Sequence, residues 1–175
     1  MYTCDHNQLS ERRLTSQVLT EQAPLEATTF VRLLRANAML RRELETRLLD
    51  AHSLTVKDYE CLLVLDAAEE SSMRRVDLAG RLLLTASGVT RLLDGLERLG
   101  FVTKRQCEAD ARVSYAVISP AGRKALTEAT TIHHAALAEI FGSLFTRKEL
   151  DTLNELLARL PGAADDVVCP LDEAS

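Results

Sequence analysis

Apolar residues recur at helical spacing through most of this chain, but residues 101–119 follow a two-residue period. The change comes directly after Gly100, a residue type that commonly ends helices. It stops at Pro120, which follows a serine and suits the first position of a new helix. An acidic turn carrying Arg112 separates two runs of alternation. The pattern predicts one β-hairpin within an otherwise helical chain.

The other periodic segments predict helices whose first residues are marked by caps. Thr55 and Asp58 form a weak capping box, Thr146 and Glu149 form a full one, and Thr85 caps the helix that ends at Gly100. The expected helices lie at about 26–50, from 55 onwards, and at about 75–83, 85–99, 120–144 and from 146 onwards. The expected strands lie at about 101–106 and 113–119, with Val113, Tyr115 and Val117 on one face.

Composition supports one soluble, mainly α-helical domain with a small hairpin. The chain has 175 residues, of which 46% are hydrophobic and only 4% aromatic, so leucine and alanine must fill the core. The first residues lack the apolar region of a secretory signal, and no run has the roughly 18 apolar residues of a membrane span. We expect a cytoplasmic protein, with a loose arm at 1–25 and a tail at 161–175.

The predicted helix at 85–99 has two different faces. Its apolar stripe should be buried, and comprises Val89, Leu92, Leu93, Leu96 and Leu99. The opposite face presents Ser87, Gly88, Thr90, Arg91, Asp94 and Arg98. Small residues permit close approach to DNA, and an arginine can bond guanine with two hydrogen bonds, so this face suits the major groove. An ordinary amphipathic surface helix would show a similar division.

Charge is distributed unevenly along the chain. The formal net charge is -5, but residues 74–124 hold ten basic and five acidic side chains, a local charge of +5. The remainder, with 11 basic and 21 acidic residues, carries -10. A basic segment inside an acidic chain favours a local surface for a polyanion such as DNA.

The order helix, turn, helix, hairpin is typical of a winged helix-turn-helix. A hairpin beside a groove-reading helix can reach the neighbouring minor groove, where an arginine such as Arg112 suits a narrow, electronegative site. Asp110, two residues earlier, is placed to hold Arg112 or to bond Arg91. A solvated turn with incidental charge is the plainer alternative.

Residues 55–124 resemble the MarR family of bacterial transcription regulators. The resemblance rests on "VDLAGRLLLTASGVTRLLDGLERLGFVTKRQCEADARVSYAVISPAGR", with its Asp110-Ala111-Arg112 wing element and its "ISPAG" joint. It extends over about residues 26–160 when the long first helix and the two late helices are included. Gly88 and Gly95 depart from the larger residues common on the family's recognition helix, and the absence of tryptophan argues against the urate-responsive subgroup.

The resemblance implies a homodimer in which helices at about 26–50 and 120–160 intertwine, and two winged lobes bind a palindromic operator in double-stranded DNA. It implies a repressor released by a small molecule, often a phenolic acid, or by cysteine oxidation. The DNA-contacting candidates are Arg75, Thr85, Ser87, Gly88, Thr90, Arg91, Lys104, Arg105, Asp110 and Arg112. The candidate lining residues of an effector pocket are Arg35, His52, Tyr59 and His133.

Two alternatives keep the same fold. A thiol-based redox switch would use Cys107, because Lys104 and Arg105 would lower the pKa of its thiol. A winged helix that only contacts other proteins is the second alternative, which the positive segment opposes. No nucleophile motif, phosphate loop or C-x-x-C pair is present, and adjacent His133 and His134 point about 100° apart on a helix. We therefore expect no enzyme activity, no cofactor and no metal site.

Overall fold

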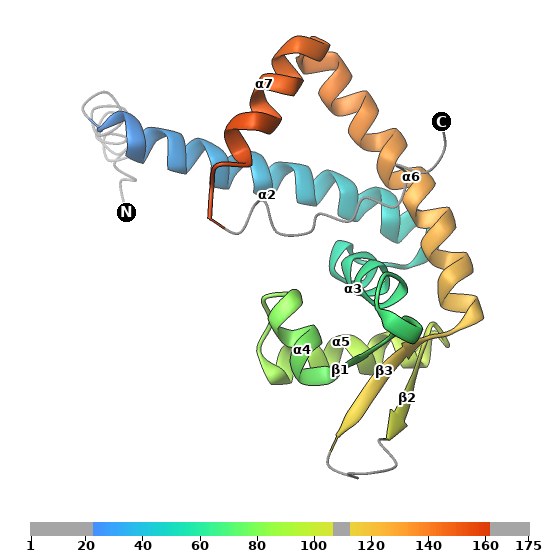
Figure 1. Cartoon of the computed structure of the whole chain (residues 1–175). Helices are drawn as coiled ribbons and strands as arrows, with labels where there is room; N and C mark the ends of the chain where they lie inside the picture. Colours follow the sequence, from blue (N-terminus) through green and yellow to red (C-terminus); the bar gives the residue numbers. More distant parts are fainter. Residues whose placement is uncertain (1–22, 107–112, 162–175) are drawn as a thin grey trace, which may run out of the picture. The chain divides into compact units, whose positions relative to one another are not determined.

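The computed structural model describes residues 23–106 and 113–161. Contacts divide the chain into two units, which meet within the first described helix, between Glu43 and Leu44. The helices are α2 (Leu25–His52), α3 (Val56–Asp66), α4 (Arg75–Arg81), α5 (Ala86–Arg98), α6 (Pro120–Leu144) and α7 (Arg147–Leu157), with a 3-10 turn η1 (Glu69–Ser71). The strands are β1 (Ser72–Arg74), β2 (Val102–Gln106) and β3 (Ser114–Ile118). The predicted class, mainly helical with a small antiparallel sheet, is confirmed (Figure 1).

The predicted caps begin the helices where the sequence placed them. Thr55 and Asp58 form a complete capping box on α3, and Thr146 and Glu149 form another on α7. Thr85 accepts a hydrogen bond from the Gly88 amide at the start of α5. Because each side chain satisfies an amide with no partner inside the helix, these residues fix the first turn locally.

The sheet has one strand more than the sequence predicted. β3 is central and pairs antiparallel with β2 on one side and with β1 on the other, where Ser72 lies opposite Val117 and Arg74 opposite Tyr115. By sequence, residues 69–75 are a polar segment that follows the helix beginning near residue 55, with no strand pattern. β1 has only three residues and no repeated alternation, so its pairing with β3 is what makes it a strand.

The two faces of β3 differ in burial. Ala116 and Ile118 are buried, whereas Tyr115 and Val117 share the other face and are half-buried. The residues that the sequence grouped on one face therefore lie there, but they form the outer face of the strand. The alternating pattern identified the two faces without showing which one met the core.

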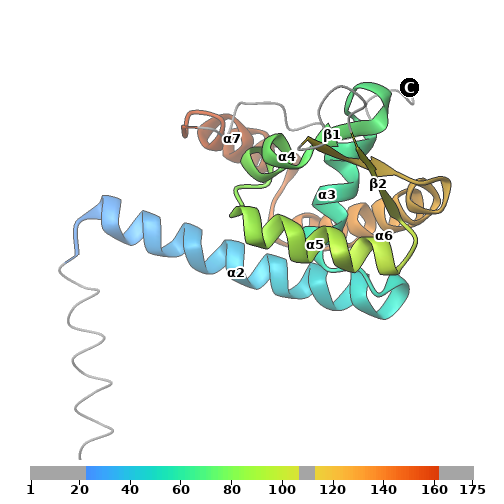
Figure 2. The same ribbon diagram turned by 90° about the horizontal axis from the view of Figure 1, so that it is seen from below.

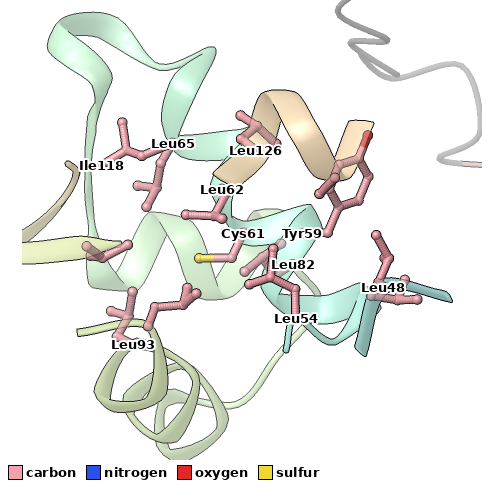
Figure 3. Packing of buried hydrophobic residues seen from close by; sticks show 14 of the residues in the cluster. Leu48, Leu54, Tyr59, Cys61, Leu62, Leu65, Leu82, Leu93, Ile118 and Leu126 are labelled. Atoms are coloured by element: carbon pink, nitrogen blue, oxygen red, sulfur yellow. The ribbon is translucent and has the colours of Figure 1, made fainter. Parts of the chain in front are cut away.

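The core of the second unit is built around α3. Leu62 and Leu65 are fully buried with Leu48, Leu54, Leu78 and Leu93 from neighbouring segments, and Figure 3 shows Cys61 among them. α3 contacts α6, β1, β3, α4 and α5, and Figures 1 and 2 show it between α6 and the pair α4–α5. Burial of several leucine side chains contributes roughly 1.5–3 kcal/mol each before conformational entropy is subtracted.

The apolar stripe of α5 is shorter than predicted. Val89, Leu93 and Leu96 are buried and Leu92 is half-buried, but Leu99 is 45% exposed. The prediction of a buried Leu99 was wrong because this residue is the C-cap of α5, and the chain turns away directly after it, at Gly100. None of the helices that the structure describes combines the length and apolar character needed to span a membrane.

The first unit, as far as it is described, is the beginning of α2. Phe30 is 60% exposed, Leu34 51% and Leu33 39%, and Leu40 is half-buried. These four residues recur at helical spacing and form one apolar stripe along the helix. In the second unit the same stripe continues into Leu44 and Leu48, which are buried.

The joint between the hairpin and α6 depends on a close backbone approach. The Ser119 amide donates to the Phe101 carbonyl oxygen at 2.9 Å, and its hydroxyl donates to the Gly100 oxygen at 2.6 Å. Gly122, in the first turn of α6, is buried against the same strand end. A Cβ atom at Gly122 would lie 2.2 Å from the Phe101 oxygen. Glycine is therefore required at position 122 because a side chain would collide with the Phe101 oxygen. The backbone angles of Gly122 do not themselves require glycine.

Gly122→Ala should lower the free energy of unfolding by about 1–3 kcal/mol, because the strand end or α6 must move. Gly142→Ala is the matched control on the same helix, where an added Cβ meets nothing within 4 Å. This control should stabilise the protein by about 0.5–1 kcal/mol through helix propensity. Urea unfolding followed by circular dichroism measures both, and equal effects would contradict the assigned close approach.

Candidate nucleic-acid interface

α4 and α5 form a helix-turn-helix joined by a short turn. The turn is closed by the Leu84 amide, which donates to the Ala79 oxygen at 2.9 Å, and Leu83 takes a φ of 53° within it. Thr85 ends the turn by capping α5. Because Val89 and Leu93 are buried against the core, the rotation of α5 about its axis is fixed, and its opposite face is held toward solvent.

The exposed face of α5 carries the predicted small and polar residues. Ser87 and Arg91 are exposed, and Gly88 and Thr90 are half-buried. The Thr85 and Ser87 hydroxyls lie 3.1 Å apart at the start of the helix. For Arg91, the described part of the chain provides no assigned hydrogen bond or ion pair. Its guanidinium group is therefore a cation exposed beside small residues, as close approach to DNA requires.

Lys104 fastens the hairpin to α5. Its Nζ atom lies 2.9 Å from the Asp94 carboxylate and 2.7 Å from that of Glu97. The hydrogen bonds to Glu97 and Asp94 raise the pKa of Lys104, and the bond from Lys104 lowers the pKa of Asp94. The sequence nominated Lys104 as a DNA contact, and the structure places it in a bridge between β2 and α5.

Arg105, the next residue of β2, also contacts groups of the protein itself. Its Nη2 atom is 3.2 Å from the Glu70 carboxylate and 3.3 Å from the Ser72 hydroxyl. Its guanidinium carbon lies 5.5 Å from the centroid of the Tyr115 ring. The side chain therefore links β2 to β3 and to the segment η1–β1, which sequence reasoning had not recognised as part of the sheet.

Internal ion pairs engage several of the cations that the sequence counted in this basic region. Within the described residues, several basic side chains at 74–124 have assigned ion-pair partners. These are Arg74 with Asp77, Lys104 with Asp94 and Glu97, Arg105 with Glu70, Arg123 with Asp66, and Lys124 with Glu128. All are at least partly exposed, so each contributes little to stability by itself. The main consequence of these ion pairs is that fewer basic side chains remain available to bind a ligand.

Arg75 reaches α5 from the start of α4. Its Nη2 atom donates a hydrogen bond to the Thr90 hydroxyl, which itself donates to the Ala86 oxygen at 2.9 Å. Arg75 and Thr90, both nominated from the sequence, are thus brought into contact. Three further nominated positions, Cys107, Asp110 and Arg112, lie outside the described residues.

Two of the four candidate effector residues lie together. The rings of Tyr59 on α3 and His133 on α6 are stacked with centroids 4.7 Å apart, and the Tyr59 hydroxyl is 3.3 Å from that of Thr130. His52 instead lies 3.6 Å from Glu128. Arg35 belongs to the first unit.

His133 occupies an unusual environment. Its Nδ1 atom is buried and has no hydrogen-bond partner among the described residues. Burial, with a smaller effect of neighbouring His134, lowers the pKa of His133 below its usual 6.5. A neutral imidazole stacked on a tyrosine with a spare polar atom could accept or donate one hydrogen bond to a small molecule. The described residues contain no group of three potential metal-ligating side chains.

Cys61 is the cysteine that the structure describes. It is fully buried among leucines, and burial raises the pKa of its thiol to about 12. A buried protonated thiol reacts slowly with oxidants, so Cys61 does not support the redox alternative.

The winged helix has matches among known proteins. Residues 54–114 match the model of the MarR family. This match, together with the relatives below, supports a MarR-type winged helix over these residues. The chain is 23% identical over 147 residues to the transcriptional repressor MprA of Escherichia coli, covering 84% of this chain and 83% of MprA.

Solved structures show the same fold. Sco3205, a MarR-family transcriptional regulator from Streptomyces coelicolor in complex with DNA, matches with a TM-score of 0.69 and 21% identity, over 77% of this chain and 85% of Sco3205. CouR from Rhodococcus jostii RHA1, bound to p-coumaroyl-CoA, matches with a TM-score of 0.65 and 21% identity, over 78% of this chain and 93% of CouR.

Replacing His133 should change how stability depends on pH. Because the pKa of His133 is lowered on folding, the unfolded chain binds more protons, and stability falls as the pH drops below 6.5 toward the lowered folded value. His133→Phe keeps an aromatic ring but cannot titrate, so its free energy of unfolding should fall less between pH 7.5 and 5.5. Urea titrations of both proteins test this, and equal pH slopes would contradict it.

Proposed function

We propose that this protein is a cytoplasmic, homodimeric transcription regulator that binds a palindromic operator by inserting α5 of each protomer into the major groove. The observation that carries the proposal is the exposed, small-residue face of α5 with Arg91 on it. A helix in this setting reads base edges when its long cation is the side chain nearest the groove. The DNA complex of Sco3205 supports the same use of the fold.

The bridges around α5 support a positioned interface over a loose basic patch. Lys104 joins β2 to two carboxylates of α5, and Arg105 joins β2 to Glu70. A hairpin held in this way keeps a constant distance from the recognition helix. We propose that Arg112 at its tip enters the minor groove and that Asp110 orients it.

The apolar stripe of α2 supports dimerisation. Phe30, Leu33 and Leu34 are exposed in the single chain, and α7 also exposes Leu156 at 49%. Exposed leucines repeated along one helix stripe are costly in water and are typical of an interface. We propose that the first and last helices pair with those of a second copy, which would place two recognition helices on one operator.

The stacked Tyr59 and His133 rings support an effector of small, aromatic character. A flat ligand could stack beside them and use the free His133 Nδ1 atom. CouR, which binds p-coumaroyl-CoA, is a structural match, and we propose a phenolic effector that releases repression. His52 remains a candidate contact for the charged end of such a molecule.

Binding to selected DNA should depend strongly on salt. Genomic fragments recovered on the purified protein supply the probe, and a scrambled fragment of equal length supplies the control. Two lobes making roughly 6–10 phosphate contacts should lose about 10³- to 10⁵-fold in affinity between 50 and 200 mM salt. Fluorescence anisotropy measures the change. Equal affinity for both fragments, or a flat salt response, would remove DNA recognition from the proposed function.

A charged substitution on the apolar stripe of α2 should prevent dimerisation, whereas the same substitution on the opposite side of α2 should not. Leu34→Asp places a charge on the exposed stripe, where the monomer fold does not need the leucine. It should sediment as a folded monomer, whereas Met39→Asp, at a residue 64% exposed on the other side of the helix, should remain a dimer. Sedimentation equilibrium with circular dichroism distinguishes the two, and a dimeric Leu34→Asp protein would show that the interface lies elsewhere.

A further inference from the structure

Arg75 is held on the recognition helix although it comes from a different helix. It is the first residue of α4, is half-buried, and donates from Nη2 to the hydroxyl of Thr90, fifteen residues later on α5. Thr90 lies one turn after Ser87 and directly before Arg91 on the half of α5 that carries the small polar residues. The Arg75 guanidinium group therefore belongs to the same surface as Arg91.

The hydroxyl of Thr90 has no proton left for DNA. A threonine hydroxyl has one proton to donate and two lone pairs that accept. Its proton is directed to the Ala86 carbonyl oxygen at 2.9 Å, the residue four positions earlier on α5. One lone pair accepts the hydrogen bond from Arg75. Thr90 can therefore donate to a phosphate or a base acceptor only by breaking its bond to Ala86.

The guanidinium group of Arg75 keeps most of its hydrogen-bonding capacity. It has five N–H donors, and within the described residues only the bond to Thr90 is assigned. The nearby Asp94 carboxylate, which also feels the charge of Arg75, is bound by Lys104 at 2.9 Å. Lys104 binds the Oδ1 atom of that carboxylate, and no hydrogen bond from Arg75 to Asp94 is assigned among the described residues.

We propose that Arg75 is a specificity-determining residue that reads a guanine in the major groove, and that Thr90 is the positioning residue that holds its guanidinium group. This inference rests on the proposed function. Within that function, it makes Arg75 a base-reading residue and makes Thr90 a residue that positions Arg75. Base recognition then comes from two helices, with Arg91 on α5 and Arg75 on α4 reading different positions. A fixed guanidinium group loses little freedom on binding, so it can discriminate bases more strongly than a mobile one.

The test uses a duplex DNA pool randomised over 20 positions, selected separately by each full-length variant and sequenced. Arg75→Ala should lose preference for guanine at one position per half-site and weaken binding to the wild-type consensus about tenfold or more. Thr90→Val removes the hydroxyl and keeps the shape, so it should relax the same position. Thr90→Ser keeps the hydroxyl and should retain the preference. Arg91→Ala should relax a different position.

Two further comparisons separate positioning from other roles. In the Arg75→Ala background, Thr90→Val should cause no additional loss, because the side chain that Thr90 holds is already absent. Arg74→Ala, which removes the neighbouring cation paired with Asp77, controls for charge and should leave every base preference unchanged. Thermal unfolding of each variant checks that the fold is retained.

The outcomes distinguish this inference from the proposed function. If the wild-type protein selects no sequence, both fail. If it selects a consensus that Arg75→Ala and Thr90→Val leave unchanged, the inference fails and the proposed function stands. Additive losses in the double variant, or relaxation of different positions by the two single variants, would show that Thr90 contacts DNA itself, and would overturn the positioning role.

Discussion

Burial of α3 is the constraint on which the winged lobe depends. Leu62, Leu65 and Cys61 are fully buried, and the helix contacts α4, α5, α6, β1 and β3. A helix surrounded in this way fixes the distance between the recognition helix and α6, because closely packed side chains transmit small displacements instead of absorbing them. Tyr59, on the same helix, is stacked on His133 of α6. A molecule that displaced this stacked pair would therefore act on a helix that also packs against α5.

Polar contacts then determine how the lobe presents its surface. The joint of Ser119 with Gly100 and Phe101, together with the close approach at Gly122, sets where the hairpin meets α6. Lys104 and Arg105 hold β2 to α5 and to the β1 side of the sheet. These exposed pairs contribute little to stability singly, and their consequence is geometric. A basic segment in a sequence can thus be used largely for internal contacts, leaving a few cations at defined places.

Several parts of this organisation could be read from the sequence because they depend on neighbouring residues. The caps at Thr55, Thr85 and Thr146 act within one helical turn, and all three begin helices as predicted. The change to a two-residue period located β2 and β3, and the spacing of Val89, Leu93 and Leu96 identified the buried side of α5. The family relationship followed from the order of these elements and from the wing motif.

What the sequence determined by itself was therefore local: where helices and strands begin, which side of each is apolar, and which family pattern they follow. Tertiary structure decided the rest. β1 is a strand only because β3 lies beside it, and Leu99 is exposed only because the chain leaves α5 at that residue. Lys104 and Arg105 read as free cations until folding brings Asp94, Glu97 and Glu70 to them, from ten, seven and thirty-five positions away. Arg75 meets Thr90 for the same reason. Hydrogen bonds and ion pairs act over a few ångströms, so their partners are set by the path of the whole chain and not by sequence spacing.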